Sequence, residues 1–442
     1  MNIMRLLGYC FLINVVLMLL PFSVVNAGDD TSLTIMYSGN LDGELEPCGC
    51  TAEGNLGGIK RRATMLDKYK ASDANTIIIS AGGLISSEGP NDLLKSAYIL
   101  KAYAQLGYDA IGLQWKDLAY GVNFSTTEKL PWVASNWLAD DFQKSVEITR
   151  MLNGNKVRLQ FFNWLAPDQS PNKQMQGEHV DVHNDINALA VQIATAKKQG
   201  SLTVLSTSLP LDIIKTLIPL DAVDLLIERA AYEVYGEPKK EERTLVLQPG
   251  SRGMRLGKLN INIDAKGNIN AWEHNVISMP DTVEDSPRMV AWYDEYNAKV
   301  KQDYLKQVAI RKQHDAGESH FVGEEVCKTC HAAQYKVWQE SDHAMAYDDL
   351  EAVGKSFDPN CLQCHTVGLN VAGGFIDMSI TPHLLGVQCE SCHGAGKQHV
   401  ASGGTTPVPN KDWPNQKICG QCHTQPHSPS FDFAKYWPKI KH

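Results

Sequence analysis

The sequence lacks any run of basic residues, and its charge is tilted toward acid. Its 442 residues include 41 Lys and Arg against 50 Asp and Glu, which gives a net charge of −9. Binding to nucleic acid requires clustered cations that neutralise a row of phosphates, so no nucleic-acid partner is expected. Beyond residue 27 the chain also lacks an apolar run long enough to cross a bilayer, so no integral membrane span is expected after removal of a signal segment.

Cysteine and histidine are scarce in the first two thirds of the chain and concentrated at its end. Eight of the 11 Cys and ten of the 14 His lie after residue 317. All eight of these Cys belong to four Cys-x-x-Cys-His motifs, at residues 327–331, 361–365, 389–393 and 419–423. At these residue frequencies, chance predicts roughly 0.01 such motif in the whole chain. The repeated motif therefore indicates a specific chemistry.

The spacing within each motif suits covalent attachment of haem. Two Cys three residues apart lie on one helical turn and can form thioether bonds to the two vinyl groups, while the adjacent His ligates the iron. The predicted attachment residues are Cys327, Cys330, Cys361, Cys364, Cys389, Cys392, Cys419 and Cys422, and the predicted proximal ligands are His331, His365, His393 and His423. A zinc site or a disulfide framework would not require a His after every second Cys, so we predict four covalently bound haem c groups.

A low-spin electron carrier needs a second strong ligand on each iron, and His is the usual one. The remaining His of this region are His320, His343, His383, His399, His427 and His442. Each could instead be a surface His or a partner of a haem propionate, and Met345 or Met378 could substitute as ligands.

Five segments around the motifs resemble the tetrahaem cytochromes of the cytochrome c-554 type. They are residues 323–331, 338–346, 357–368, 386–400 and 428–442, so the resemblance covers about residues 320 to 442. It implies that His from outside the motifs complete most irons, while one haem can remain five-coordinate. The matching positions are His343 and His399, with His383 and His442 as the next candidates. The resemblance does not assign a distal His to a particular haem.

Residues 28 to 280 alternate β-branched runs with amphipathic stretches, which favours an α/β layered domain. Expected strands include residues 33–37, 76–80, 202–206, 224–227 and 243–247, and expected helices include residues 91–106 and 186–198. Residues 256–269 are typical of a β-hairpin. The landmarks at residues 106–121, 134–136 and 248–259 resemble the metallophosphoesterase domain of bacterial 5′-nucleotidases, which implies a β-sandwich flanked by helices.

The metal-binding positions of that family can be compared with this sequence one by one. They fall on Asn40, Asp42, Gly83, Trp115, Lys116, Thr207, Ala230 and Tyr232. Nearly all of these side chains are unable to hold the two cations that such hydrolases place between the attacking and leaving oxygens. The departure from the pattern predicts a metallophosphoesterase-like scaffold without phosphohydrolase activity.

A Cys-Gly-Cys sequence, Cys48 to Cys50, follows the first expected strand. It could be a structural disulfide, a pair of buried thiols, a soft-metal site or a redox-active dithiol, and the sequence leaves these alternatives open.

Near its start the chain has a basic residue, Arg5, then an apolar stretch over residues 6–25 and small residues before Gly28. This pattern predicts a signal peptide, residues 1–27, and export to the periplasm or beyond, with an uncleaved anchor as the alternative. A helical, largely exposed connector is expected within residues 281–316, and the haem region spans residues 317–442.

Taken together, the patterns predict an exported electron-transfer protein with four haem c groups, a redox donor and a redox acceptor. The alternative is an oxidoreductase that acts on a small nitrogen compound or oxyanion at a five-coordinate haem.

Overall fold

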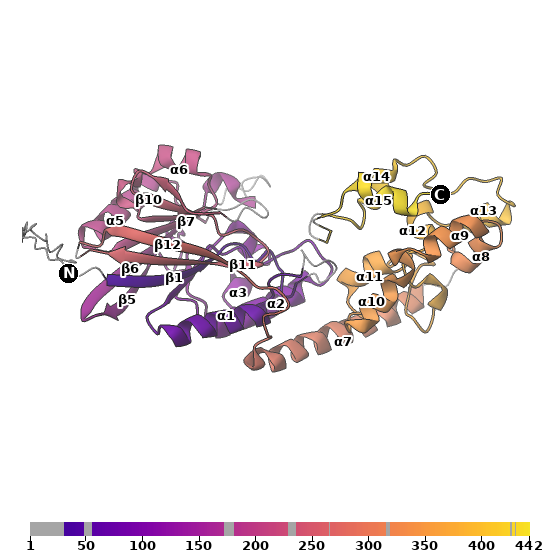
Figure 1. The fold of residues 1–442 in the computed structure, drawn as a ribbon, viewed down its shortest axis with the longest axis horizontal. Coiled ribbons are helices and arrows are strands. Elements are labelled where there is room, and N and C mark those ends of the chain that lie inside the picture. Colours follow the sequence, from indigo (N-terminus) through magenta and orange to yellow (C-terminus); the bar gives the residue numbers. More distant parts are fainter. Residues whose placement is uncertain are drawn as a thin grey trace, which may run out of the picture.

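The structure, a computed structural model, describes residues 31–47, 55–171, 181–228, 236–264, 266–314, 319–424, 427–428 and 430–442. Its N-terminal part contains two six-stranded sheets with helices on their outer faces, and a helical part follows at the far end of a long helix (Figure 1).

The first sheet has the strand order β12-β11-β1-β2-β3-β4. Its strands are β1 (Thr31–Ser38), β2 (Ile77–Ser80), β3 (Ala110–Gly112), β4 (Trp132–Val133), β11 (Arg255–Ile263) and β12 (Ile269–Ser278). Strand β1 pairs in parallel with β2 and antiparallel with β11, with Ile35 opposite both Ile77 and Leu259. β11 and β12 form the antiparallel hairpin that the sequence predicts.

The second sheet has the order β5-β6-β7-β8-β10-β9. Its strands are β5 (Val146–Leu152), β6 (Asn155–Trp164), β7 (Leu202–Thr207), β8 (Leu225–Glu228), β9 (Lys239–Glu241) and β10 (Thr244–Leu247). The central strands β6, β7, β8 and β10 run parallel. Because parallel strands require crossover connections, helices cover the outer face of this sheet.

Alternation along β1 divides its side chains between two apolar cores. Leu33, Ile35 and Tyr37 point between the two sheets and pack with residues of the second sheet such as Phe161. Met36 points to the opposite face and joins the core under the helices. Two sheets packed face to face with helices outside confirm the layered α/β fold.

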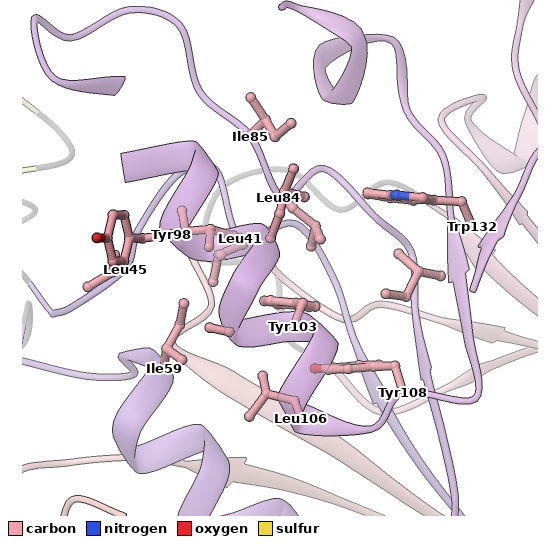
Figure 2. Packing of buried hydrophobic residues seen from close by; sticks show 14 of the residues in the cluster. Leu41, Leu45, Ile59, Leu84, Ile85, Tyr98, Tyr103, Leu106, Tyr108 and Trp132 are labelled. Carbon is pink, nitrogen blue, oxygen red and sulfur yellow. The ribbon is translucent and has the colours of Figure 1, made fainter. Parts of the chain in front are cut away.

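The N-terminal part contains the helices α1 (Ile59–Ser72), α2 (Asp92–Leu106), α3 (Val122–Ser125), α5 (Ile186–Lys198) and α6 (Leu211–Leu217), with the 3₁₀ turns η1 (Trp115–Leu118), η2 (Pro167–Gln169) and η3 (Leu220–Ala222). α1 and α2 cover the first sheet, and α5 and α6 cover the second. Figure 2 shows how Leu41 and Leu45, from the loop after β1, pack beside α2 in the first of these cores.

The 3₁₀ turn η4 (Pro287–Met289) leads into the long helix α7 (Val290–His314). As expected, most side chains of α7 are exposed, but one side of the helix is buried. Trp292, Tyr296, Val300 and Tyr304 are all buried and, four residues apart, form one stripe along the helix. The first three belong to the N-terminal core and Tyr304 belongs to the core of the helical part, so α7 packs against both.

The helical part consists of short segments around a small apolar core that includes Leu362 and Phe375. Its elements are α8 (Glu324–Lys328), α9 (Ala332–Gln339), η5 (Asp342–Met345), α10 (Ala346–Ala352), α11 (Pro359–His365), η6 (Pro382–Leu384), α12 (Cys389–His393), α13 (Lys397–Ala401), α14 (Asn415–Cys419) and α15 (Phe433–Ile440). Among the residues described, none of the helices combines the length and apolarity that crossing a bilayer requires.

Candidate haem-binding site

Each Cys-x-x-Cys-His motif folds as a single helical turn. In the first motif the His331 amide donates to the Cys327 carbonyl at 2.9 Å, and in the fourth the His423 amide donates to the Cys419 carbonyl at the same distance. Such i to i+4 bonds bring the two sulfurs and the imidazole of a motif to one side of the chain. The local geometry therefore matches the requirement for two thioethers and one iron ligand.

Sulfur contacts connect the four motifs in space. Cys327 of the first motif is hydrogen-bonded to Cys389 of the third, and Cys364 of the second is hydrogen-bonded to Cys422 of the fourth. Burial, together with the neighbouring thiols of the fourth motif, raises the pKa of Cys392 in the third to about 11. The spatial order of the motifs is thus first, third, fourth and second.

Three proximal His face a second His. The ring centroids are 6.1 Å apart for His331 and His399, 6.1 Å for His343 and His423, and 5.9 Å for His393 and His442.

This separation fits an iron between the rings. A metal held between two imidazole nitrogens at about 2 Å each separates the ring centroids by about 6 Å. Imidazoles in direct van der Waals stacking would lie closer together. The residues present therefore fit haem with two axial His at three motifs.

Hydrogen bonds at Nδ1 orient several of these rings. The His399 Nδ1 lies 2.8 Å from the Thr406 carbonyl oxygen, the His442 Nδ1 lies 2.9 Å from that of Ile440, and the His423 Nδ1 lies 3.0 Å from the Ser428 hydroxyl. Donation from Nδ1 leaves Nε2 as the free lone pair, which is the arrangement that metal-binding His use.

Burial also favours the neutral form of three of these imidazoles. It lowers the pKa of His343, His393 and His423, and the other His nearby lower it further. A neutral imidazole is the form that binds a metal, so the site needs no deprotonation at neutral pH.

His365 of the second motif differs from the other three proximal His. Its Nδ1 lies 2.5 Å from the Ala346 carbonyl oxygen, so its orientation is fixed as well. Within the described part of the chain, however, no ring contact pairs it with a second His. His383 is exposed in η6. Among the described residues its ring makes no contact with a proximal His, so its role as a ligand stays a prediction.

One residue that the sequence analysis missed holds the first and third motifs together. Glu390, inside the third motif, is only 4% exposed. Its carboxylate accepts hydrogen bonds from the amides of Val322 at 2.9 Å, Gly323 at 2.8 Å and Gly396 at 2.7 Å. Its position between the two Cys of the motif did not reveal this role, because the Cys-x-x-Cys-His pattern does not specify the two middle residues.

The positions compared with phosphoesterase metal ligands come together at the ends of the first sheet's strands. The Lys116 ammonium lies 2.5 Å from the Asp42 carboxylate, and the Gln114 amide donates to Asn40 Oδ1 at 2.7 Å. A side chain at Gly83 would lie 2.7 Å from the Asn40 side chain. No group of three His, Cys, Asp or Glu that could hold a metal occurs among the residues with described positions.

Three other positions compared with metal ligands are Thr207, Ala230 and Tyr232, and they are not among the residues that contact Asn40 or Asp42 above. Thr207 donates to the Trp164 carbonyl at 3.2 Å and stands in a strand of the second sheet. Ala230 and Tyr232 lie outside the described residues, as do Cys48, Cys50 and the predicted signal peptide.

The fold and the motifs thus define a chain with a phosphoesterase-like sandwich followed by a helical region of c-type haem motifs. Comparison with known proteins agrees for both parts. The model of the family described as "Cytochrome c554 and c-prime" matches residues 326–394, which include the first three motifs. A cytochrome c-554 from Nitrosomonas europaea is 30% identical over 139 residues, which is 24% of this chain and 59% of the relative. The chain therefore spans about three fifths of that relative's length.

Solved structures that resemble this chain include a 5′-nucleotidase and a calcineurin-like phosphoesterase. A 5′-nucleotidase precursor from Thermus thermophilus aligns with a TM-score of 0.52 and 17% identity, over 67% of this chain and 63% of that protein. A calcineurin-like phosphoesterase from Bacillus subtilis aligns with a TM-score of 0.48 and 17% identity, over 61% of this chain and 98% of that one. At these identities the likeness extends to the fold and no further.

Both resemblances noted in the sequence are therefore confirmed. The C-terminal region resembles cytochromes of the c-554 type, a resemblance that implies covalently bound haem c, and the N-terminal region has the metallophosphoesterase-like fold.

Proposed function

We propose that this chain is an exported electron-transfer protein that binds four haem c groups and relays electrons between a redox donor and a redox acceptor. The observation that carries the proposal is the set of three His pairs about 6 Å apart, each containing a motif His. In this proposal residues 1–27 are a signal peptide, residues 28–280 a scaffold domain, residues 281–316 a connector and residues 317–442 the haem domain.

Bound haem supplies reversible one-electron chemistry at iron. The four Cys pairs would attach the haem groups, and His331, His365, His393 and His423 would each bind an iron. The second His at the first, third and fourth motifs would be His399, His442 and His343. Backbone carbonyls and the Ser428 hydroxyl hold ring orientations, so little rearrangement of the ligands is required when charge changes.

The order of the motifs supports a path for electrons through the domain. Sulfur contacts connect the first motif to the third and the fourth to the second, and Cys392 of the third motif lies near enough to the Cys residues of the fourth to interact with them electrostatically. Closely spaced carriers in one line allow entry at one end and exit at the other, so we assign the first and second motifs to the two ends.

The scaffold role of the N-terminal domain rests on the ion pair of Lys116 with Asp42. An ammonium bound to this carboxylate competes electrostatically with a cation, and hydrolysis of phosphoesters by this fold depends on two metals.

A spectroscopic experiment tests the proposal. The protein is produced with its signal segment in a host that attaches c-type haem, and its intact mass and reduced absorption spectrum are recorded. We expect the mass of four haem groups above that of the polypeptide and predominantly low-spin bands. A colourless protein without added mass would refute the assignment.

A second candidate function follows from the second motif. His365 has no second His in ring contact among the described residues, which favours a five-coordinate haem that reduces a small nitrogen compound or oxyanion. A high-spin band that shifts with nitric oxide or carbon monoxide, together with reductive turnover of such a substrate, would favour this enzyme. Bands that are all low-spin would favour electron transfer alone.

A further inference from the structure

The loop after β1, residues 39–47, is held rigidly against the first sheet. The amides of Leu41 and Asp42 both donate to the Gly83 carbonyl, at 3.0 and 2.9 Å, and Leu41 and Leu45 are buried in the apolar core beside α2 (Figure 2). Asp42 and Gly43 have positive φ angles of 56° and 75°, which turn the loop sharply between these two anchors.

Three alternate residues of this loop, Asp42, Glu44 and Glu46, each form an ion pair with a cationic side chain. Asp42 binds Lys116, and Glu44 binds the Arg252 guanidinium at 3.0 Å, both within the N-terminal domain. Glu46 instead binds Lys355 of the helical part, with 2.5 Å between the carboxylate oxygen and the ammonium nitrogen. The loop that carries a metal ligand position in the related fold therefore ends here in a contact with the haem region.

The Lys355 ammonium is enclosed on several sides. Its side chain is 12% exposed, and it also donates to the Asn297 side chain of α7 at 3.1 Å. The Tyr293 hydroxyl donates to the second oxygen of Glu46. Burial acts to lower the pKa of Lys355, but the Glu46 carboxylate and the Tyr293 phenol raise it above its usual value, so the Lys355 ammonium keeps its charge.

Lys355 adjoins the second motif. The Asp358 amide donates to the Lys355 carbonyl at 3.0 Å, and Asp358 is the N-cap of α11, the helix that contains Cys361, Cys364 and His365. The two parts also approach closely beside the ion pair. Gly89 of the N-terminal domain lies so near α11 that a Cβ atom added to it would be 2.9 Å from the Asn360 side-chain oxygen.

Charge in this contact reaches the motif itself. The Tyr296 phenol of α7 is buried, and its burial together with the charges of Asp358 and Glu46 raises its pKa. A partly buried charge is screened far less than a charge in water. The charges of Lys355 and Glu46 should therefore change the energy of adding an electron to a haem attached at Cys361.

We propose that the ion pair of Glu46 with Lys355 couples the N-terminal domain to the second motif and sets the reduction potential of the haem attached through Cys361 and Cys364. This inference rests on the proposed haem attachment. Glu46 is a positioning residue that acts through Lys355: its carboxylate offsets the ammonium charge, which on its own would favour the reduced haem.

The test is a spectroelectrochemical titration of the full-length holoprotein, in which each haem takes one electron from a reduced mediator and no bond is formed or broken. Glu46→Gln leaves Lys355 uncompensated, so the potential of one component rises. Lys355→Met leaves the carboxylate uncompensated, so the same component falls. We expect each ratio of reduced to oxidised haem to change on the order of tenfold, which is about 59 mV for one electron. The double variant should return close to wild type.

Potential shifts of opposite sign in the two single variants distinguish this coupling from simple loosening of the interface. Loosening would shift the potential of the component in the same direction in both variants. Such a common direction, or unchanged potentials in both, would overturn the proposal. Glu46→Asp keeps the charge and should leave the potential at the wild-type value. If Glu46→Gln fails to fold, Lys355→Met still tests the predicted fall in potential. Glu241→Gln breaks a matched pair with Lys215, 3.1 Å apart in the N-terminal domain, and should change nothing.

The affected component is identified by its absence from the titration of a Cys361→Ala/Cys364→Ala protein, or by its altered potential in a His365→Met protein if the first does not accumulate. The haem content of the wild-type protein, measured by intact mass, separates the two proposals. Four attached haems without the paired shifts would refute the coupling alone, whereas missing haem would refute the proposed function.

Discussion

Replacement of Glu390 tests whether one buried carboxylate holds the first and third motifs together. The side chain is 4% exposed and accepts hydrogen bonds from the amides of Val322, Gly323 and Gly396. The first two amides precede α8 with the first motif, and the third follows α12 with the third motif. Every hydrogen bond given for these three amides among the described residues goes to Glu390.

The expected magnitude follows from the number of amides left without an acceptor. A buried donor without a partner costs about 1–3 kcal/mol, so Glu390→Ala exposes three such penalties, partly relieved by entering water. We expect a loss of roughly 4 kcal/mol for Glu390→Ala. Glu390→Gln keeps one oxygen and should cost about 1–2 kcal/mol, because its NH₂ group then faces an amide N–H.

The assay is guanidinium unfolding of the holoprotein, followed by Soret absorbance for the haem region and by far-UV circular dichroism for the whole chain. The Soret transition should move to lower denaturant concentration in the order wild type, Glu390→Gln, Glu390→Ala. Glu340→Gln, which removes an exposed partner 3.8 Å from Lys336, is the matched control and should lie within about 0.5 kcal/mol of wild type. A Glu390→Ala protein within about 1 kcal/mol of wild type would refute the reasoning.

Four further outcomes are expected. Replacement of His399 by Ala should convert one low-spin haem to high-spin, whereas His320→Ala should leave the spectrum unchanged; magnetic circular dichroism distinguishes the two. Burial raises the pKa of Asp117 to about 6, against the opposing hydrogen bonds from backbone amides. Since the folded pKa lies above the unfolded one, the stabilising contribution of Asp117 is complete below pH 4 and is lost as pH rises through 6. The difference in unfolding free energy between wild type and Asp117→Asn should therefore shift by roughly 3 kcal/mol across this range, measured by denaturant titration at several pH values; a constant difference would contradict the raised pKa. Incubation with a nucleotide and Mn²⁺ should release no phosphate above a protein-free blank, and robust turnover would contradict the scaffold role. Mass spectrometry of the exported protein should place its first residue at Gly28, and a retained segment would favour an anchor.

Secondary structure in the N-terminal part was largely predictable from the sequence. β-Branched runs at residues 33–37 and 202–206 are strands, and the amphipathic stretch at residues 186–198 is α5. Local periodicity sufficed because each element buries one face or one stripe. α7 is largely exposed, as predicted, but its buried stripe was not predicted, because many charged residues lie between the four aromatic and β-branched residues that form it.

The haem-attachment motifs were determined by the sequence alone, because covalent attachment and proximal ligation are local and need only one helical turn. The sequence did not determine which distal His faces which proximal His. His331 and His399, for example, lie 68 positions apart in the chain and meet only when the segments pack. The same holds for Glu46 and Lys355, whose contact forms between two parts of the fold. Chemistry that one turn of helix can complete is visible in the order of residues, whereas the pairing of ligands and the electrostatic coupling between domains depend on tertiary packing.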